Sequence, residues 1–418
     1  MSIIKKLFKA GNVSTQIDGS GHKRGKIKLV AIAKDEAFYF PEWVHHHLYF
    51  GFDEIDIYIN RTTDNSVEVL DSISSIYPQV SWFSADWIDK CPQDAKKQIQ
   101  FIVYNKVWDE ALREGGYSHI FFLDIDEFWI PKSFDLTIHQ FLDNYSQSDV
   151  ISFEWLNDLG DLNAFSELPI NIKGNLSPLV KTLYPIDTPI VELRHHVGLL
   201  ESNAKHILVD GALFKPRQSL IQAVHEDLQS LKAAFIYHRA HRSIEEYISL
   251  LYRGRPGETF PYKTNRHGLP TPDSWYQEVA LPEDAYFQYT ASLNRFKEEI
   301  DFSNISKAAK QFVLTRFNES MANLKEYVAQ DYPVMMQMFR GVFHHEVVSV
   351  FSQQRARMVE ESPSDFRLIR DLAIDAASQS IDEAITLMEK AHILNPTGPL
   401  INKKLDEFKR IATSQQAK

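Results

Sequence analysis

Apolar runs of strand length alternate with helix-like segments over the first 155 residues. The runs lie at 26–34, 54–60, 80–85, 119–126 and 149–155. Amphipathic segments between them predict helices over 40–50, 65–76 and 93–114. Strands that alternate with helices form mostly parallel sheets, with helices on both faces. The pattern therefore predicts an α/β, Rossmann-like fold for this part of the chain.

The pattern changes further along the chain. Between 156 and 300 the signal weakens, and we expect loops over 157–175 and 253–272 and a helix over 243–252. Short strands are expected over 180–183, 189–193, 208–214 and 233–238. After residue 303, glycine and proline are sparse and helical periodicity continues to the end, so this region should be all-α.

These changes divide the chain into three predicted parts. They are a flexible N-terminal arm over 1–25, an α/β domain over 26–300 and a C-terminal helical region over 303–418. Within the last part, Ile381–Asn395 and Leu400–Ile411 predict two antiparallel helices. The pair is similar to a tetratricopeptide-type repeat, but such arrays need three or more repeats, so we favour a plain helical appendage.

Composition and charge exclude several classes of protein. Of the 418 residues, 44% are hydrophobic and 24% are charged, as in globular proteins. The net charge is 45 − 56 = −11, which argues against a nucleic-acid partner because phosphate binding needs a basic face. Cys91 is the single cysteine, so the chain has no intrachain disulfide and no Cys-rich zinc site. No run approaches the ~20 apolar residues that span a bilayer, although residues 1–10 could lie on an anionic membrane surface.

The most informative stretch is Phe121–Trp129, where Asp124 and Asp126 follow a buried strand. Ligands of open α/β sheets bind at the carboxyl ends of strands. A spacing of two along a strand places both carboxylates on one face, and a turn would still let them converge on one ion. Carboxylate oxygens suit Mg²⁺ or Mn²⁺, which accept phosphate oxygens. The pair therefore indicates a metal–diphosphate site, and the alternative is that both acids merely cap the next segment.

Polar residues also follow the first two strands. The first strand ends near Lys34 and Glu36, and the second is followed by the stretch that contains Asp64. If the strands are parallel, these residues lie at the same edge of the sheet as Asp124. A carboxylate at this edge can accept hydrogen bonds from a base or a ribose, but Asp64 could equally be the N-cap of the next helix.

Together these stretches resemble the family-2-like glycosyltransferases of the GT-A fold, in the branch related to family 92. The resemblance covers about 26–130. The matching residues are Lys34, Glu36, Glu42, Trp43, His47, Gly51, Asn60, Asp64, Ser66, Asp124, Asp126, Glu127 and Phe128. A weaker match follows at Tyr237-His238, at the Ser-x-Glu-Glu-Tyr stretch from Ser243, and at Arg253-Gly254.

The resemblance implies an inverting, metal-dependent transfer of a sugar from a nucleotide-diphosphate sugar, with a UDP-sugar as the expected donor. The acceptor would be a hydroxyl group of a saccharide or glycolipid, and the cofactor Mn²⁺ or Mg²⁺. Metal ligands would be Asp124, Asp126 and His238, with His241 in reserve. The expected nucleotide-sugar-binding residues are Lys34, Glu36, Asp64, Asp124 and Lys181.

An inverting transferase also needs a carboxylate base for the acceptor proton. We expect Asp158 in this role, with Glu154 and Asp161 as the other candidates, and we expect Trp155 to stack on the acceptor sugar. The consecutive residues His45–His47 do not suit a metal, because neighbours on a helix point about 100° apart.

Two alternatives remain. A metal-dependent nucleotidyltransferase would carry a glycine-rich loop after the first strand, and 34–41 has no glycine. An inactive GT-A module could serve as a scaffold through its C-terminal helices, where a protein partner is also conceivable. The resemblance to bacterial members suggests a cytoplasmic enzyme, peripheral to the inner membrane face at most.

Overall fold

The computed structural model describes residues 25–160, 162–254, 259–270 and 276–416. The predicted arm over 1–25 therefore lies outside the described residues, except for Gly25. Within the described part, the chain divides into two compact units, each assembled from separate segments. The first unit comprises residues up to 156, 176–238 and 281–305, and the second comprises 157–175, 239–280 and 306 onward. The continuous domains over 26–300 and 303–418 stay a prediction, since the compact units follow different limits.

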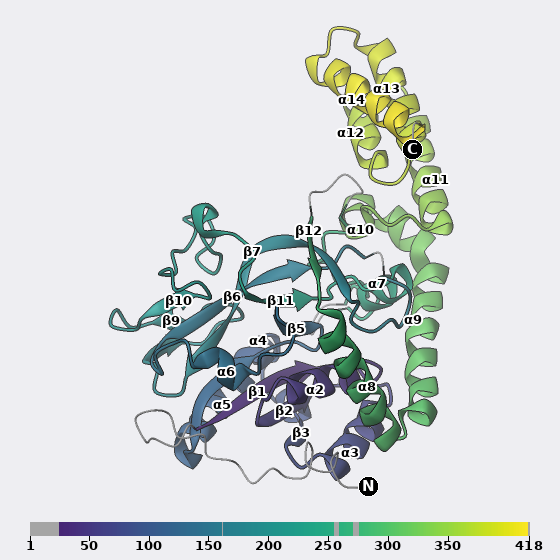
Figure 1. Ribbon diagram of the computed structural model, residues 1–418. Helices are drawn as coiled ribbons and strands as arrows, with labels where there is room; N and C mark the ends of the chain where they lie inside the picture. The colour runs from purple at the N-terminus through teal and green to yellow at the C-terminus, as the bar shows by residue number, and fades with distance from the viewer. Residues whose placement is uncertain (1–24, 161, 255–258, 271–275, 417–418) are drawn as a thin grey trace. The chain divides into compact units, whose positions relative to one another are not determined.

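A mixed sheet forms the centre of the first unit (Figure 1). Its strands run in the order β3-β2-β1-β4-β7-β6-β11-β5, and β10 pairs with β6. The strand bounds are β1 (Lys26–Ala33), β2 (Glu54–Ile59), β3 (Val80–Ser84), β4 (Tyr117–Phe122), β5 (Glu127–Pro131), β6 (Val150–Asn157), β7 (Asn171–Pro185), β10 (His206–Leu208) and β11 (Ala234–His238). A separate two-stranded sheet consists of β8 (Ile190–Glu192) and β9 (Leu199–Leu200).

The two halves of this sheet differ in strand direction. In the half built first along the chain, β1 is parallel to β2 and β4, and β2 is parallel to β3. In the other half, β7 is antiparallel to β4, and β5 is antiparallel to β11. The α/β prediction is confirmed. The first half is parallel as predicted, whereas the second half is mixed, because β10 is parallel to β6.

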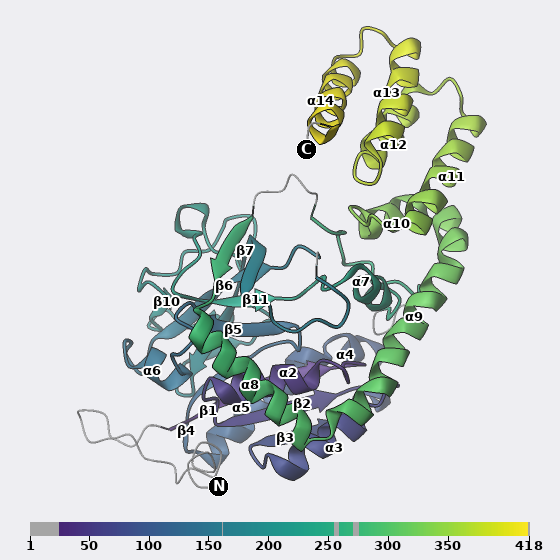
Figure 2. The ribbon, with the colours of Figure 1, turned by 45° about the vertical axis from the view of Figure 1, so that its right-hand side comes forward.

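Helices cover both faces of the sheet in the first unit. Their bounds are α2 (Phe40–Tyr49), α3 (Ser66–Ile76), α4 (Gln93–Lys97), α5 (Ile99–Glu114), α6 (Ile138–Leu142) and α8 (Glu283–Glu299). On one face, Tyr104 of α5 stacks on Phe122 of β4. On the other face, Phe121 stacks on Phe52, just after α2. Alternation along β4 thus gives each face its own apolar layer, and Figure 2 shows α2 beside α8 on the second face.

Several elements differ from the sequence prediction, and the strand expected over 208–214 is observed as β10 over His206–Leu208. The helix expected over 93–114 is interrupted at Gln98, where α4 ends and α5 begins. The strand β5 was not predicted, because its pairing with β11 joins residues far apart in the sequence. The strand β7 begins at Asn171, inside the expected loop over 157–175, and runs well beyond the short strand predicted at 180–183.

The three consecutive histidines of α2 form hydrogen bonds within the fold. His46 donates from Nε2 to the carbonyl oxygen of Trp129 (2.8 Å), and His47 donates from Nδ1 to that of Trp43 (2.8 Å). His45 forms a separate hydrogen bond through Nε2 to Ser292 (2.9 Å). Because burial disfavours the imidazolium form, the pKa values of His45 and His46 fall to about 3.

The second unit contains the predicted all-α C-terminal region. The helix bounds are α7 (Ile244–Leu251), α9 (Phe302–Gln330, entering from the first unit), α10 (Tyr332–Phe339), α11 (His345–Glu361), α12 (Phe366–Ala376), α13 (Ile381–Leu394) and α14 (Pro399–Gln416). The strand β12 (Gln277–Ala280) pairs antiparallel with the first residues of β7. Ala384 and Ala391 of α13 are fully buried, and the buried guanidinium group of Arg355 forms an ion pair with Glu383. Among the described helices, none has the length and apolar character needed to cross a membrane.

Candidate active site

The two aspartates of the Asp-x-Asp motif lie in a turn, and their side chains separate. The central strand β4 ends at Phe122, and β5 begins at Glu127. Two hydrogen bonds close the turn between them. The Glu127 amide donates to the carbonyl oxygen of Asp124 (3.0 Å), and the Asp124 amide donates to Oε2 of Glu127 (2.9 Å). The residues thus lie at the carboxyl end of a buried strand, as predicted, but each aspartate has its own surroundings.

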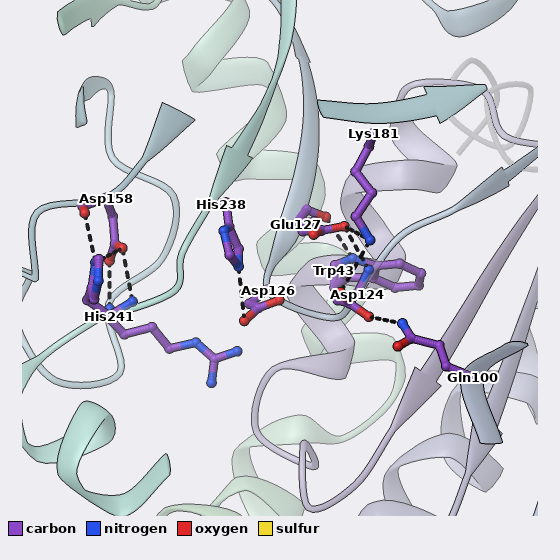
Figure 3. Close-up of polar contacts among 10 residues, drawn as sticks. Trp43, Gln100, Asp124, Asp126, Glu127, Asp158, Lys181, His238 and His241 are labelled. Carbon is purple, nitrogen blue, oxygen red and sulfur yellow. Dashed lines mark hydrogen bonds and ion pairs between the residues drawn. The ribbon is translucent and has the colours of Figure 1, made fainter. Parts of the chain in front are cut away.

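Asp124 is held by a lysine and a glutamine. Lys181 of β7 places its Nζ 3.3 Å from Oδ2 of Asp124 and 3.1 Å from Oε2 of Glu127, and only 2% of the lysine side chain is exposed. Gln100 of α5 donates to the other oxygen of Asp124 (3.1 Å), as Figure 3 shows. Burial alone would raise the pKa of Asp124, but the nearby ammonium group outweighs it and the pKa falls below its usual value.

Asp126 pairs with a histidine. The Nε2 atom of His238 lies 3.5 Å from Oδ2 of Asp126 (Figure 3). His238 is the last residue of β11 and lies directly opposite Glu127 in the antiparallel pairing with β5. Asp126, Glu127 and His238 each offer one ligand atom, and these atoms lie within 4.8 Å of one another. Oxygen and imidazole ligands at this spacing suit a divalent cation, so the residues present fit the expected Mn²⁺ or Mg²⁺.

Glu127 received no role from the sequence, although it is at the centre of this site. Its side chain is fully buried, and its Oε2 atom accepts from Lys181 and from the Asp124 amide. Its Oε1 atom has no hydrogen-bond partner among the described residues. Burial raises the pKa of Glu127 well above its usual value. The one signal in the sequence was its place in the Asp-x-Asp-Glu-Phe pattern.

Trp155 and Glu154 of β6 point to opposite faces of the sheet, as neighbours on a strand do. The Trp155 ring packs on the rings of His238 and His196, with centroid separations of 4.2 and 4.8 Å, and 8% of the residue is exposed. This contact orients His238, while binding of the acceptor by Trp155 stays a prediction.

Glu154 is fully buried, its oxygens have no hydrogen bond among the described residues, and burial raises its pKa to about 8.

Asp158 is an internal hydrogen-bond acceptor of the second unit. Its Oδ1 atom accepts from the amide and from Nδ1 of His241 (both 2.9 Å; Figure 3). Its Oδ2 atom accepts from the Arg242 amide (2.6 Å). Burial would raise the pKa of Asp158, but His241 and these hydrogen bonds lower it. Asp158 as the base stays a prediction, and Asp161 lies outside the described residues.

The side chain of Asp64, in the loop after β2, forms a hydrogen bond to the loop after β1. Its carboxylate accepts from the amides of Ala37 (2.9 Å) and Ser66 (3.0 Å). The N-cap position of α3 is Asn65, whose side chain makes no capping hydrogen bond, and Asp64 just before it accepts from the amide of Ser66, the first residue of the helix. Glu36 is buried and Lys34 is half-buried at the same edge of the sheet. Binding of the nucleotide by these three residues stays a prediction.

Comparison with known families agrees with this geometry. Residues 31–167, which include the acidic turn after β4, match the model of glycosyltransferase family 92. The chain is a glycosyltransferase related to family 92. The match spans about a third of the 418 residues, includes Asp124 to Glu127, and ends before Lys181 and His238. A search of curated proteins found no match.

Proposed function

We propose that this enzyme transfers a sugar from a nucleoside-diphosphate sugar, with UDP as the nucleotide, to a hydroxyl group of a saccharide or glycolipid. A glycosyltransferase of this family uses a sugar donor and a saccharide acceptor. The proposal adds dependence on Mn²⁺ or Mg²⁺ and inversion at the anomeric carbon. The observation that carries it is the pairing of Asp126 with His238 beside Asp124, at the carboxyl end of β4.

The charge of the site supports a divalent cation. With Asp124 and Asp126 ionised and Lys181 protonated, the formal charge is −2 + 1 = −1, and it becomes −2 when Glu127, whose pKa is raised by burial, loses its proton. A bound divalent cation would offset this charge and stabilise the diphosphate as it leaves. Asp126 and His238 would hold the ion, and the sequence also assigns Asp124 to it.

Lys181 acts on the donor indirectly in this proposal. Its ammonium group is enclosed between two carboxylates, so it holds Asp124 in place and is not itself open to a phosphate. The side chain of Asp124 is 38% exposed and can accept hydrogen bonds from hydroxyl groups of the donor. The support for UDP and for inversion is the family resemblance, and the base is not assigned because Glu154 and Asp158 are both fully buried.

Binding of donor and metal can be tested by thermal unfolding of the full chain. We expect UDP-sugars to stabilise the protein only when Mn²⁺ is present, by about 2.7 kcal/mol at a ligand concentration 100-fold above Kd. Asp126→Asn should abolish this stabilisation and the release of UDP. Asp109→Asn, on the exposed surface of α5, is the matched control and should behave as the wild type. Equal stabilisation of the wild type in EDTA would contradict the role of the metal.

A further inference from the structure

Glu127 and His238 are direct neighbours across two antiparallel strands. Residues that face each other in such a pair place their side chains on the same side of the sheet, with Cβ atoms about 4.5–5.5 Å apart. Asp126 precedes Glu127 in the turn, and its carboxylate reaches His238. Two strand ends and one turn therefore bring these three side chains together without any contribution from the side chain of Asp124.

The Oε1 atom of Glu127 is buried and has no hydrogen-bond partner among the described residues. A buried acceptor without a hydrogen bond costs free energy, so such atoms are rare in folded proteins. The Oε2 atom of the same carboxylate is fixed by Lys181 at 3.1 Å and by the Asp124 amide at 2.9 Å. One oxygen of this fixed carboxylate lies within 4.8 Å of ligand atoms of Asp126 and His238, and Oε1 is the oxygen that has no hydrogen-bond partner among the described residues.

We propose that Glu127 is a metal ligand, so that Asp126, Glu127 and His238 hold the cation and Asp124 lies outside the ligand set. The inference rests on the proposed function for the presence of a divalent cation, and it replaces the set Asp124, Asp126 and His238. An octahedral ion with bonds of about 2.1 Å separates adjacent ligand atoms by roughly 3.0 Å and opposite ones by roughly 4.2 Å. The three ligand atoms lie within 4.8 Å of one another, so the side chains must draw together when the ion binds.

The surroundings of Asp124 support its exclusion. Gln100 and Lys181 occupy its two carboxylate oxygens, one each. Outer residues of this kind orient ligands and tune their charge. Lys181 bridges Asp124 and Glu127, so it acts as a positioning residue. Asp124 remains available to the donor sugar through its exposed part.

Direct measurement of Mn²⁺ binding distinguishes the two ligand sets. Free Mn²⁺ is quantified by electron paramagnetic resonance during titration of the full chain, without nucleotide. We expect Asp126→Asn, Glu127→Gln and His238→Asn each to weaken binding by at least about 10-fold. Asp124→Asn should change it by less than about 3-fold. Retained affinity in Glu127→Gln, or a loss in Asp124→Asn as large as in Asp126→Asn, overturns the inference.

Folding is controlled in the same samples by circular dichroism. If Glu127→Gln does not fold, Glu127→Asp is the variant that tests the ligand role. It keeps a carboxylate near Lys181, but its shorter side chain moves that carboxylate away from the ligand atoms of Asp126 and His238. We expect at least about 10-fold weaker Mn²⁺ binding for this variant too, and wild-type affinity overturns the inference.

Failure of the proposed function has a different signature. A wild-type protein that binds Mn²⁺ through Glu127 but neither binds nor consumes nucleotide sugars contradicts the donor assignment and leaves the ligand set intact. A wild-type protein that transfers sugar and binds Mn²⁺ through Asp124, with Glu127 dispensable, contradicts only the ligand set.

Discussion

Replacement of Lys181 by methionine tests the charge balance of the acidic turn. The ammonium group lies 3.3 Å from Asp124 and 3.1 Å from Glu127, where each contact has a Coulomb energy of roughly 5 kcal/mol at an effective dielectric constant of about 20. Desolvation offsets much of this energy, and Asp124 is partly exposed to solvent. Removal of one partner from a buried ion pair costs about 3–5 kcal/mol. We expect Lys181→Met to lose about 3 kcal/mol, because two carboxylates then face each other without a cation.

Thermal unfolding without metal gives the assay. For a unit of this size, 3 kcal/mol corresponds to a Tm lower by roughly 6–12 °C. Mn²⁺ should stabilise Lys181→Met more than the wild type, since the ion restores positive charge between the same carboxylates. The matched control is Lys106→Met, which removes a partly exposed i,i+4 pair with Glu110 and should cost about 0.5 kcal/mol. Equal Tm values for the two variants, or equal stabilisation of wild type and Lys181→Met by Mn²⁺, would refute this reasoning.

Three further predictions concern buried titratable groups. Burial raises the pKa of Glu154 from 4.5 to about 8, so the folded protein keeps a proton that the unfolded chain releases in this pH range. The free energy of unfolding therefore falls by about 1.4 kcal/mol per pH unit as pH rises from about 4.5 to 8. Glu154→Gln should remove this slope in urea unfolding, and an unchanged slope counts against the assignment. The pKa of His46 is lowered to about 3, so the unfolded chain binds a proton that the folded protein does not, and the free energy of unfolding decreases as pH falls from about 6.5 towards 3. His46→Asn should reduce this dependence of the unfolding free energy on pH by about 1.4 kcal/mol per pH unit, as measured by urea unfolding. Asp158→Asn should lower stability by about 3 kcal/mol because the carboxylate accepts from His241 and Arg242, whereas lost turnover at wild-type Tm would favour its role as the base.

Local sequence patterns were sufficient for much of the first half of the fold. The strands β1, β2, β3 and β6 and the helices α2 and α3 begin and end within a few residues of their predicted limits. Their alternation of apolar and polar residues is a local property, and burial on one or two faces follows from it. The same reasoning placed Asp124 and Asp126 after a buried strand.

The second half of the sheet could not be predicted in this way. The strand β5 is short and directly follows the acidic turn, and only its antiparallel partner β11 makes it a strand. The expected loop over 157–175 gives way to β7 at Asn171, where pairing with β12 extends the strand. Such pairings depend on residues distant in the sequence, and one sequence without relatives carries no signal for them.

The amino-acid sequence by itself determined the α/β class, the all-α end of the chain and the place of the acidic motif at the end of a central strand. Only the tertiary structure decided which side chains surround each aspartate: Lys181 and Gln100 beside Asp124, and His238 beside Asp126 and Glu127. The physical reason is that side-chain periodicity and burial are set locally, whereas the register between distant strands depends on packing of the whole sheet.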